Sequence, residues 1–467
     1  MLSSDRFIPN IYAKAYYEGF VLTLILIWLP FKFLAYLVPF IAMGWFIVRA
    51  NSGKTFFRLI FFLLLVIVII GSYYFYYLFT NIDFILQNAF LAFLTYGSFF
   101  FFAVLSFRMD LYNVHYRKYL EVIKIAILVE ASLGIFQAVA YISINGGNFD
   151  SATGDVVQGT LDPLSFLNPV GNFNNQIYTT NLFILLLFYT PYVVRYRKGI
   201  FICLIGFFAI VLASVWHLFL AFLFALGLIT VYFNDFFKRI KLTGSRLLLV
   251  IFLILIVIGA LATQPKNFSL VAHYYEEIIS KGESPKTIVA VNSVTKLPNK
   301  FPWVYAIGLG PGQYSSRAGL IGTGQYFGDF NNPTKIPLLS PQFSPAFDEF
   351  VFPYWEEVAT NPAKYGNSTM SRPFSSIQSI LIEAGFVAFT LITLAVIGFI
   401  NRLKRVYSSG VTHGNWFKSS YAYSCAVLVL FFVAFSFFEN YMEVTQAIFP
   451  GLLIMKYFYS CTKEGEF

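Results

Sequence analysis

The chain alternates long apolar runs with short polar segments. Runs of about 17–25 apolar residues match the length that an α-helix needs to cross the hydrocarbon core of a bilayer. The run over 16–48 is continuous, and we divide it at Pro30 because Lys32 would otherwise lie within the membrane. The run over 199–233 is also continuous, and we divide it near Ser214. Twelve helices are then expected, at 16–30, 31–48, 56–79, 83–107, 119–144, 174–194, 199–213, 215–233, 245–263, 376–400, 416–438 and 441–459.

Composition supports an all-α polytopic membrane protein. Hydrophobic residues make up 58% of the 467 residues and charged residues only 12%. Soluble domains are nearer to about 45–50% apolar and about 25% charged. This excludes a water-soluble globular enzyme, a disordered chain and a coiled coil. Two of the three cysteines, Cys203 and Cys425, lie in apolar runs and Cys461 lies in the C-terminal tail, so neither a disulfide framework nor a cysteine metal site is predicted.

The distribution of charge predicts the orientation. With the N-terminus inside, 22 of the 32 Lys and Arg fall on the inner side, whereas the short outer loops carry acids. The formal net charge of +9 is therefore mainly a topology signal, and we expect no nucleic-acid partner. We also find no cleavable signal, since no short apolar core precedes a small-residue cleavage site. Both termini are expected in the cytoplasm, with the protein in a bacterial cytoplasmic membrane.

The only long polar segment lies outside the membrane in this topology. Residues 264–375 contain 12 of the 19 Pro, nine Gly and 18 aromatic residues. Disorder would predict few aromatics, so we expect a folded external loop with short helices at 270–281, 287–297 and 343–360. The chain then divides into 1–263 with nine helices, the external loop, and 376–467 with three helices. A second outer segment, 145–173, is rich in Gly, Asn and Asp.

The strongest local motif is Gly308-Leu309-Gly310-Pro311-Gly312-Gln313-Tyr314, followed by Arg317. Glycines such as Gly310 and Gly312 let a backbone turn tightly and approach a ligand. A guanidinium can grip a phosphate with its planar fork. The alternative is a surface turn with a solvated Arg317. Lys300 lies just upstream and is more simply interpreted as a solvated cation.

Two further candidates lie where the external loop enters the tenth helix. Arg372 precedes that helix, where it is either a phosphate ligand or an interfacial anchor. Glu383 lies about two turns inside the helix, and ionisable groups in a membrane are functional candidates by default. Pairing of Glu383 with a loop cation is the structural alternative.

Glu130 and His217 are the remaining ionisable candidates. Glu130 lies near the middle of the fifth helix with Lys124 closer to the inner face, as a proton-coupled transporter could use. A carboxyl hydrogen-bonded to Ser or Tyr is the simpler interpretation. His217 lies at the turn between the seventh and eighth helices and is either a base or a capping residue.

Acidic and aromatic residues alternate over 348–357, which suits either a sugar or an amphipathic helix packed by its aromatic face. No His/Cys cluster, HExxH or DxD motif is present, so we expect no catalytic metal and no cofactor. The inner loops hold no phosphate-binding loop, which argues against an ATP-driven pump in this chain.

Three strings and the twelve-helix layout resemble the O-antigen ligase/polymerase superfamily. Gly308–Tyr314 is similar to a Gly-x-Gly-Pro-Gly-x-Phe/Tyr element in that family's long periplasmic loop. Ser376–Gly385, SIQSILIEAG, is similar to its Leu-x-x-Leu-x-Glu-x-Gly helix. Asn168-Pro169 through Asn175 resembles an Asn-Pro-Asn stretch before the sixth helix. Arg317 with Gly328 also matches an Arg-x10-Gly pattern of Wzy-type polymerases.

This resemblance implies a GT-C-like glycosyltransferase that works outside the cytoplasm without a metal. Its donor and acceptor would be glycans on undecaprenyl diphosphate, with loop arginines such as Arg317 holding the diphosphate. It also admits a chain-length regulator and a flippase as partners. Ligases carry a His about nine residues before the helix-ten Glu and a Ser-Arg pair opening helix eight, and this chain has neither.

Those two departures favour a Wzy-type polymerase that joins lipid-linked repeat units. Arg317, Arg372, Lys300, Gly310, Gly312 and Tyr314 are the expected diphosphate or glycan contacts. His217 or Glu383 is the expected general base, with Arg317 stabilising the leaving group. The alternatives are an O-antigen ligase-like transferase and a polysaccharide or lipid transporter.

Overall fold

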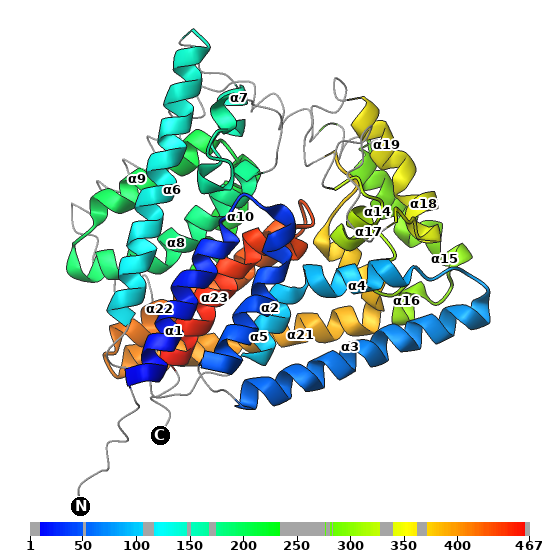
Figure 1. The fold of residues 1–467 in the computed structure, drawn as a ribbon, viewed down its shortest axis with the longest axis horizontal. Helices are drawn as coiled ribbons and strands as arrows, with labels where there is room; N and C mark the ends of the chain where they lie inside the picture. The colour runs from blue at the N-terminus through cyan, green and yellow to red at the C-terminus, as the bar shows by residue number, and fades with distance from the viewer. Residues whose placement is uncertain are drawn as a thin grey trace, which may run out of the picture.

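The computed structural model describes residues 10–49, 53–105, 116–146, 151–167, 174–233, 276, 281–282, 284–326, 340–361 and 371–462. Every regular element within these ranges is a helix (Figure 1). The longer elements are α1 (Asn10–Ile27), α2 (Lys32–Arg49), α3 (Gly53–Thr80), α4 (Leu86–Thr95), α5 (Gly97–Val104), α6 (Tyr116–Ile144), α8 (Asn174–Tyr196), α9 (Ile200–Ala213), α10 (Trp216–Phe233), α21 (Ser376–Thr412), α22 (Trp416–Phe435) and α23 (Thr445–Thr462).

The two predicted breaks in continuous apolar runs are confirmed. α1 ends at Ile27 and α2 begins at Lys32, so the cation lies at a helix end. α9 and α10 are separated by Ser214, which has a left-handed backbone with φ 55°. The single helix predicted over 83–107 is wrong in detail, because α4 and α5 are bent by 56° there. The predicted helix at 245–263 lies outside the described residues.

Seven of the described helices are long and apolar enough to cross a membrane, or eight if the bent pair α4–α5 forms one span. These seven are α2, α3, α6, α8, α10, α21 and α22. The helices found at the other predicted spans are too short or too polar to be recognised as membrane-crossing helices. α9 has 14 residues, α1 carries Lys14 and Glu18, and α23 carries Gln446 and Lys456. The described residues therefore account for seven or eight of the twelve expected spans.

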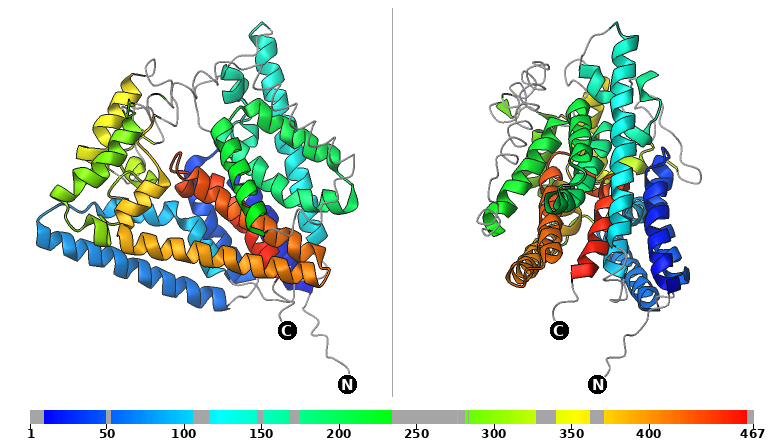
Figure 2. Two further views of the ribbon diagram at one scale, coloured as in Figure 1. Left: turned by 180° about the vertical axis from the view of Figure 1, so that it is seen from behind. Right: turned by 90° about the vertical axis from the view of Figure 1, so that its left-hand side faces the viewer.

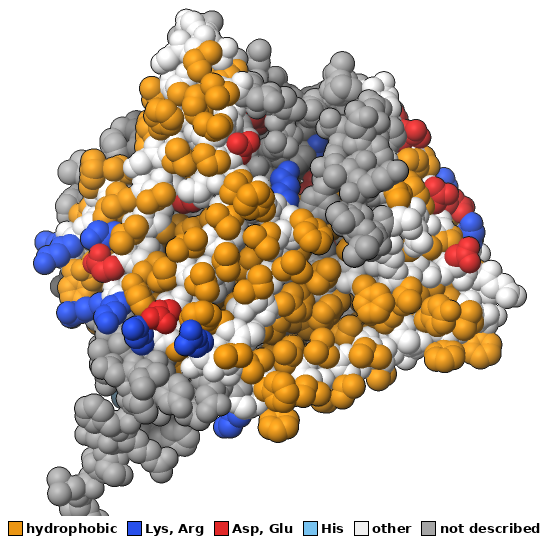
Figure 3. Space-filling view, in the orientation of Figure 1, with side chains coloured by type: hydrophobic (Ala, Val, Ile, Leu, Met, Phe, Trp, Pro, Cys, Tyr) orange, Lys and Arg blue, Asp and Glu red, His pale blue; other side chains and the backbone are white. Residues whose placement is uncertain are grey.

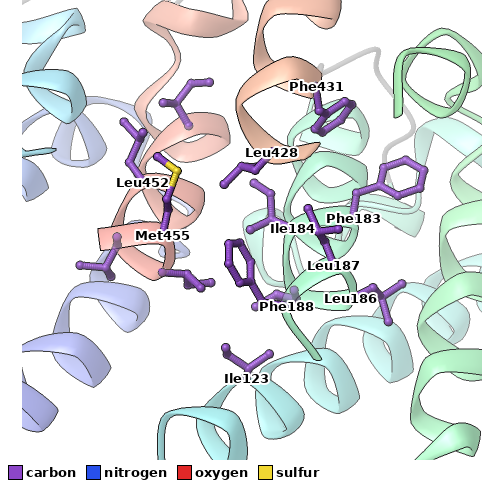
Figure 4. Packing of buried hydrophobic residues seen from close by; sticks show 14 of the residues in the cluster. Ile123, Phe183, Ile184, Leu186, Leu187, Phe188, Leu428, Phe431, Leu452 and Met455 are labelled. Carbon is purple, nitrogen blue, oxygen red and sulfur yellow. The ribbon is translucent and has the colours of Figure 1, made fainter. Parts of the chain in front are cut away.

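The main core lies where α6, α8, α22 and α23 meet (Figure 4). α8 is the centre of this core, since it contacts each of the other three helices. Ile184 and Phe188 of α8 face Leu428 of α22 and Met455 of α23 (Figure 4). Ile123 of α6 closes the same core from below in that view. These contacts hold α23 centrally, so that the turn preceding it has a fixed position.

α3 and the second half of α21 present apolar side chains outward. Phe57, Phe61 and Leu391 are each more than 60% exposed, which is costly in water and favourable in lipid. Hydrophobic side chains cover most of the face in Figure 3, and Lys and Arg gather at its lower left. The surface is thus that of a membrane protein with its bundle turned toward lipid.

The described residues between 284 and 361 contain a compact group of short helices, which we call the cap. It comprises α14 (Pro285–Thr295), α15 (Leu297–Lys300), α16 (Val304–Ile307), α17 (Arg317–Gly322), α18 (Pro345–Phe350) and α19 (Phe352–Thr360). Helices predicted at 287–297 and 343–360 are confirmed here, whereas 270–281 lies outside what the structure describes apart from residues 276 and 281. Figure 2 shows the cap on one side and α6, α9 and α10 on the other, with the turn between α22 and α23 between them.

The cap has its own hydrophobic core. Phe301, Tyr314, Phe347 and Trp355 are buried together in it. The acids beside them, Asp348, Glu349 and Glu356, are exposed. The alternation over 348–357 is therefore that of amphipathic helices packed by their aromatic faces.

The segment over 151–167 is fixed to α6 by two buried side chains. It contains α7 (Ser151–Asp155), η2 (Gly159–Leu161) and η3 (Ser165–Leu167). The Gln137 amide accepts N–H bonds from Gln158 at 2.9 Å and Gly159 at 2.8 Å. The Glu130 carboxylate accepts the N–H of Thr160 at 3.1 Å and also its hydroxyl. Glu130 thus holds this segment in place, which agrees with its structural interpretation.

Candidate functional site

The glycine motif forms a loop, here called the glycine loop (308–314), that is paired with α21. Leu309 N–H donates to Ile382 O at 2.9 Å, and Gly310 N–H donates to Glu383 O at 2.9 Å. These carbonyls are available because α21 is kinked at Gly385, where φ is 77°. Gly308, with φ 78°, lies directly against this kink. The glycine motif (308–314) and the α21 motif (376–385) are therefore in contact through their backbones.

Replacing Gly308 with alanine is expected to destabilise the protein. A Cβ there would lie 2.3 Å from Glu383 O, and φ is in the left-handed region. Strain of this kind costs about 2 kcal/mol or more in the free energy of unfolding. A lower melting temperature of the detergent-solubilised protein would show it. Gly398→Ala in α21 is the control, since no atom lies within 4 Å of that added Cβ; equal melting temperatures for the two variants would contradict the prediction.

The Glu383 carboxylate is occupied by the glycine loop. Its Oε2 accepts Gly312 N–H at 2.6 Å and its Oε1 accepts Tyr314 N–H at 2.9 Å. The side chain is buried. Charge-assisted bonds from backbone amides are strong, so Glu383 fixes the path of the loop. The structural alternative predicts that Glu383 pairs with a loop cation, but its partners are backbone amides.

A second carboxylate fixes the helix that follows the loop. Glu443, in the short helix η5 (Tyr441–Glu443), accepts the Arg317 N–H at 2.5 Å through Oε2. Asn440 Nδ2 donates to Ser315 O at 2.6 Å, which joins the same two segments. Ser316 caps α17 by accepting Gly319 N–H at 3.3 Å. The backbone at Ser315 and Arg317 is thus bound at two points by the turn over 440–443.

Three cations gather around one carboxylate at this point; we call Arg317, Arg372, Lys286 and Glu439 the cation cluster. Arg317 Nη2 lies 3.5 Å from Glu439 Oε1. The Lys286 ammonium donates to the carbonyl oxygen of Phe438, the neighbour of Glu439. Both arginines stack on aromatic rings of the cap, with the Arg317 guanidinium 4.9 Å from the Tyr326 centroid and the Arg372 guanidinium 5.4 Å from the Trp355 centroid.

The three cations of this cluster outnumber the two acids nearest to Arg317, which are Glu439 and Glu443. Burial lowers the pKa of Lys286 to about 8, an effect that Glu439 opposes and Arg372 reinforces. Burial also lowers the pKa of Arg372 to about 10, with Glu439 opposing and Arg317 reinforcing. Repulsion among buried cations is relieved by an added anion. The cluster can therefore bind a polyvalent anion such as a diphosphate.

The structure brings together only part of the predicted site. Arg317 and Arg372 lie in the cation cluster, whereas Tyr314 is buried in the cap core. Gly310 and Gly312 pack against α3 and α4 residues, so they shape the loop. Lys300 is instead ion-paired with Glu349 on the cap surface, and both side chains are about half exposed. Lys300 is thus a surface cation, as its simpler interpretation held.

His217 contacts the turn that carries the cluster. Its Nε2 lies 3.3 Å from the Tyr441 hydroxyl, and its ring is 5.5 Å from that of Phe438. The Tyr441 hydroxyl in turn donates to Gln176 of α8. His217 therefore supports η5 from the side of α10.

The sequence interpretation missed Lys286, Asn440 and Glu443. Residues 441–459 were predicted as a helix, which placed Glu443 inside a span, whereas α23 begins at Thr445. The signal was present as a polar run, Glu439-Asn440-Tyr441-Met442-Glu443, between two apolar stretches. Two acids four residues apart at the outer end of a bundle could have indicated a site there.

Intramembrane charges of the kind that a transporter uses find local partners. Glu130 is bound by Thr160, as described above. Lys124 forms an ion pair with Glu121 at 2.9 Å on the exposed side of α6. These two residues do not form a connected polar path in the part of the chain described.

Comparison of the chain with protein-family models, with curated proteins and with solved structures finds no match.

Proposed function

We propose that the protein is a Wzy-type polysaccharide polymerase. It would join oligosaccharide repeat units carried on undecaprenyl diphosphate on the outer side of a bacterial cytoplasmic membrane, in a twelve-span GT-C-like fold with both termini inside. The observation that carries the proposal is the convergence of Arg317, Arg372 and Lys286 around Glu439, next to the glycine loop.

The proposed reaction needs what this cluster offers. An acceptor hydroxyl attacks the anomeric carbon of the donor glycan, and the bond from that carbon to the diphosphate oxygen breaks. The electron pair leaves with undecaprenyl diphosphate, whose charge increases. Cations fixed in advance at that position stabilise the transition state more than the ground state. Arg317 suits this task because its backbone is bound by Glu443 and its side chain is stacked on Tyr326.

An O-antigen ligase-like transferase is the second candidate, since it would use the same donor and the same diphosphate site. A polysaccharide or lipid transporter is less well supported, because Glu130 and Lys124 have local partners. Deleting the gene and analysing the lipid-linked glycans of the cells separates the three. Single repeat units on the outer leaflet support the polymerase, long unattached chains indicate a ligase, and units confined to the inner leaflet indicate a flippase.

Binding of the diphosphate is expected to weaken above about pH 8. The lowered pKa of Lys286 means that its positive charge is present below about 8 and is lost as the pH rises through that value. Glu439, Arg372 and His217 are the ionisable groups around it. Affinity for undecaprenyl diphosphate should fall by up to about tenfold between about pH 7.5 and 9, because diphosphate esters are already fully ionised there.

Titration calorimetry of the purified protein at several pH values measures this effect. A Lys286→Arg variant keeps its charge over the same interval and should show a flat profile. A flat profile for the unmodified protein would remove Lys286 from the diphosphate site.

A further inference from the structure

A carboxylate in the middle of a diphosphate site requires an explanation. Glu439 is 3% exposed and lies among the three cations that would hold the donor. Its negative charge opposes the binding of another anion. If the only task of the cluster were binding, an uncharged residue at position 439 would serve better.

The hydrogen bonds of Glu439 leave one oxygen available. Oε1 accepts Asn440 N–H at 3.2 Å and lies 3.5 Å from Arg317 Nη2, which is long for a direct bond. Oε2 is buried and has no hydrogen-bond partner among the described residues, and the same holds for Nε of Arg317. Glu443 Oε1 is likewise buried without a hydrogen-bond partner among the described residues. Unsatisfied polar atoms of opposite charge therefore lie in one buried site, which is a mark of a site that awaits a ligand.

The other two acids of the site, Glu383 and Glu443, hold backbone amides of the neighbouring segments. Glu383 accepts two backbone amides of the glycine loop, one on each oxygen. Glu443 accepts the Arg317 backbone amide, and protonation would weaken that hold on α17. The His217 ring contacts Phe438, and its Nε2 lies 3.3 Å from the Tyr441 hydroxyl. Glu439 differs from Glu383 and Glu443 because it holds no backbone amide of the glycine loop or of α17, so its protonation leaves both segments in place.

We propose that Glu439 is the general base that takes the proton from the acceptor hydroxyl. This inference rests on the proposed glycosyl transfer. When the donor diphosphate enters, its phosphate oxygens compete with Glu439 for the fixed Arg317 guanidinium, which frees the carboxylate. A neighbouring diphosphate also favours the protonated form of a carboxyl. Donor binding would therefore free the base, so that the acceptor hydroxyl is activated only when a donor glycan is bound.

The step balances with these groups alone. The acceptor oxygen forms a bond to the anomeric carbon as its proton passes to Glu439 Oε2. The bond between that carbon and the diphosphate oxygen breaks, and undecaprenyl diphosphate leaves with the electron pair. Glu439 returns its proton to solvent or to the diphosphate when the product departs.

Glu439→Gln tests the proposal by separating binding from transfer. The amide keeps the shape of the side chain but removes both the charge and the base. Transfer should fall by about 100-fold or more, measured with lipid-linked repeat units extracted from the deletion strain. Affinity for undecaprenyl diphosphate should stay the same or tighten, because a competing anion is gone. Glu356→Gln, an exposed residue of α19, is the control and should leave both quantities unchanged.

Other outcomes overturn the inference in distinct ways. If Glu439→Gln weakens diphosphate binding and transfer together, Glu439 only positions Arg317. If it leaves transfer intact, Glu439 is not the base. If the unmodified protein neither binds the diphosphate nor elongates glycans, the proposed function itself fails. Glu439→Ala with added formate gives a second measurement, since a small carboxylate restores a missing base but leaves a structural defect unrepaired.

Discussion

Arg317→Ala is expected to abolish most polymer formation. The variant removes the cation that is best fixed, held by Glu443 at its backbone and stacked on Tyr326. Loss of one charge-stabilising donor typically costs about 100- to 1,000-fold in rate. Cells carrying Arg317→Ala should accumulate single lipid-linked repeat units and should lack long chains, as gel analysis and mass spectrometry of extracted glycolipids would show.

Lys296→Ala is the matched control, because Lys296 is an exposed cation of the cap at the end of α14. Arg317→Lys should retain part of the activity, since it keeps the charge but loses the planar fork. Normal chain lengths in the Arg317→Ala strain, with protein present in the membrane, would contradict the assignment of this residue to the site.

Glu383→Ala is expected to have the largest effect on folding. The change leaves the buried amides of Gly312 and Tyr314 without their acceptor. Each unsatisfied buried group costs about 1–3 kcal/mol, so we expect a loss of about 2–6 kcal/mol in the free energy of unfolding. Glu383→Gln should be intermediate, because the amide oxygen can accept from one N–H while its NH₂ group faces the other. The melting temperature of the purified protein should follow the order Glu, Gln, Ala.

Glu356→Ala on the exposed face of α19 serves as the control for stability. If Glu383→Ala were as stable as the original protein and only inactive, Glu383 would act in catalysis, as the sequence first predicted. The two interpretations are separated by whether stability and activity fall together.

The apolar pattern predicts where the helices lie along the chain, but it does not predict where they bend or kink. Breaks at Pro30 and Ser214 follow from length and charge, and both occur close to the expected positions. The bend between α4 and α5 occurs next to Gly97, and the kink of α21 occurs at Gly385, where Gly308 of the glycine loop packs against it. Gly312 packs on the backbone of Asn88 in α4, and Gly308 packs on the kink of α21. Such contacts join residues more than 70 positions apart and are invisible to periodicity.

The candidate site could likewise be predicted only in part from the sequence. The residue types at Arg317 and Arg372 suggest an anion site, and the structure brings the two near one another beside Glu439. Glu383 was noticed because a charge in an apolar helix is conspicuous, but its role depends on backbone amides that the sequence does not place. Lys286 and Glu443 were missed because each is ordinary in its own segment. Lys286 enters the site because α14 lies against Phe438, and Glu443 enters it because η5 lies against the start of α17.

The most direct test of the account is elongation by the purified protein. Lipid-linked repeat units extracted from the deletion strain are incubated with the protein in nanodiscs, and product lengths are measured by mass spectrometry. The account predicts chains of two or more repeat units together with released undecaprenyl diphosphate, and neither product with Arg317→Ala. Repeat units that remain single with the unmodified protein, or that lengthen equally well with Arg317→Ala, would contradict it.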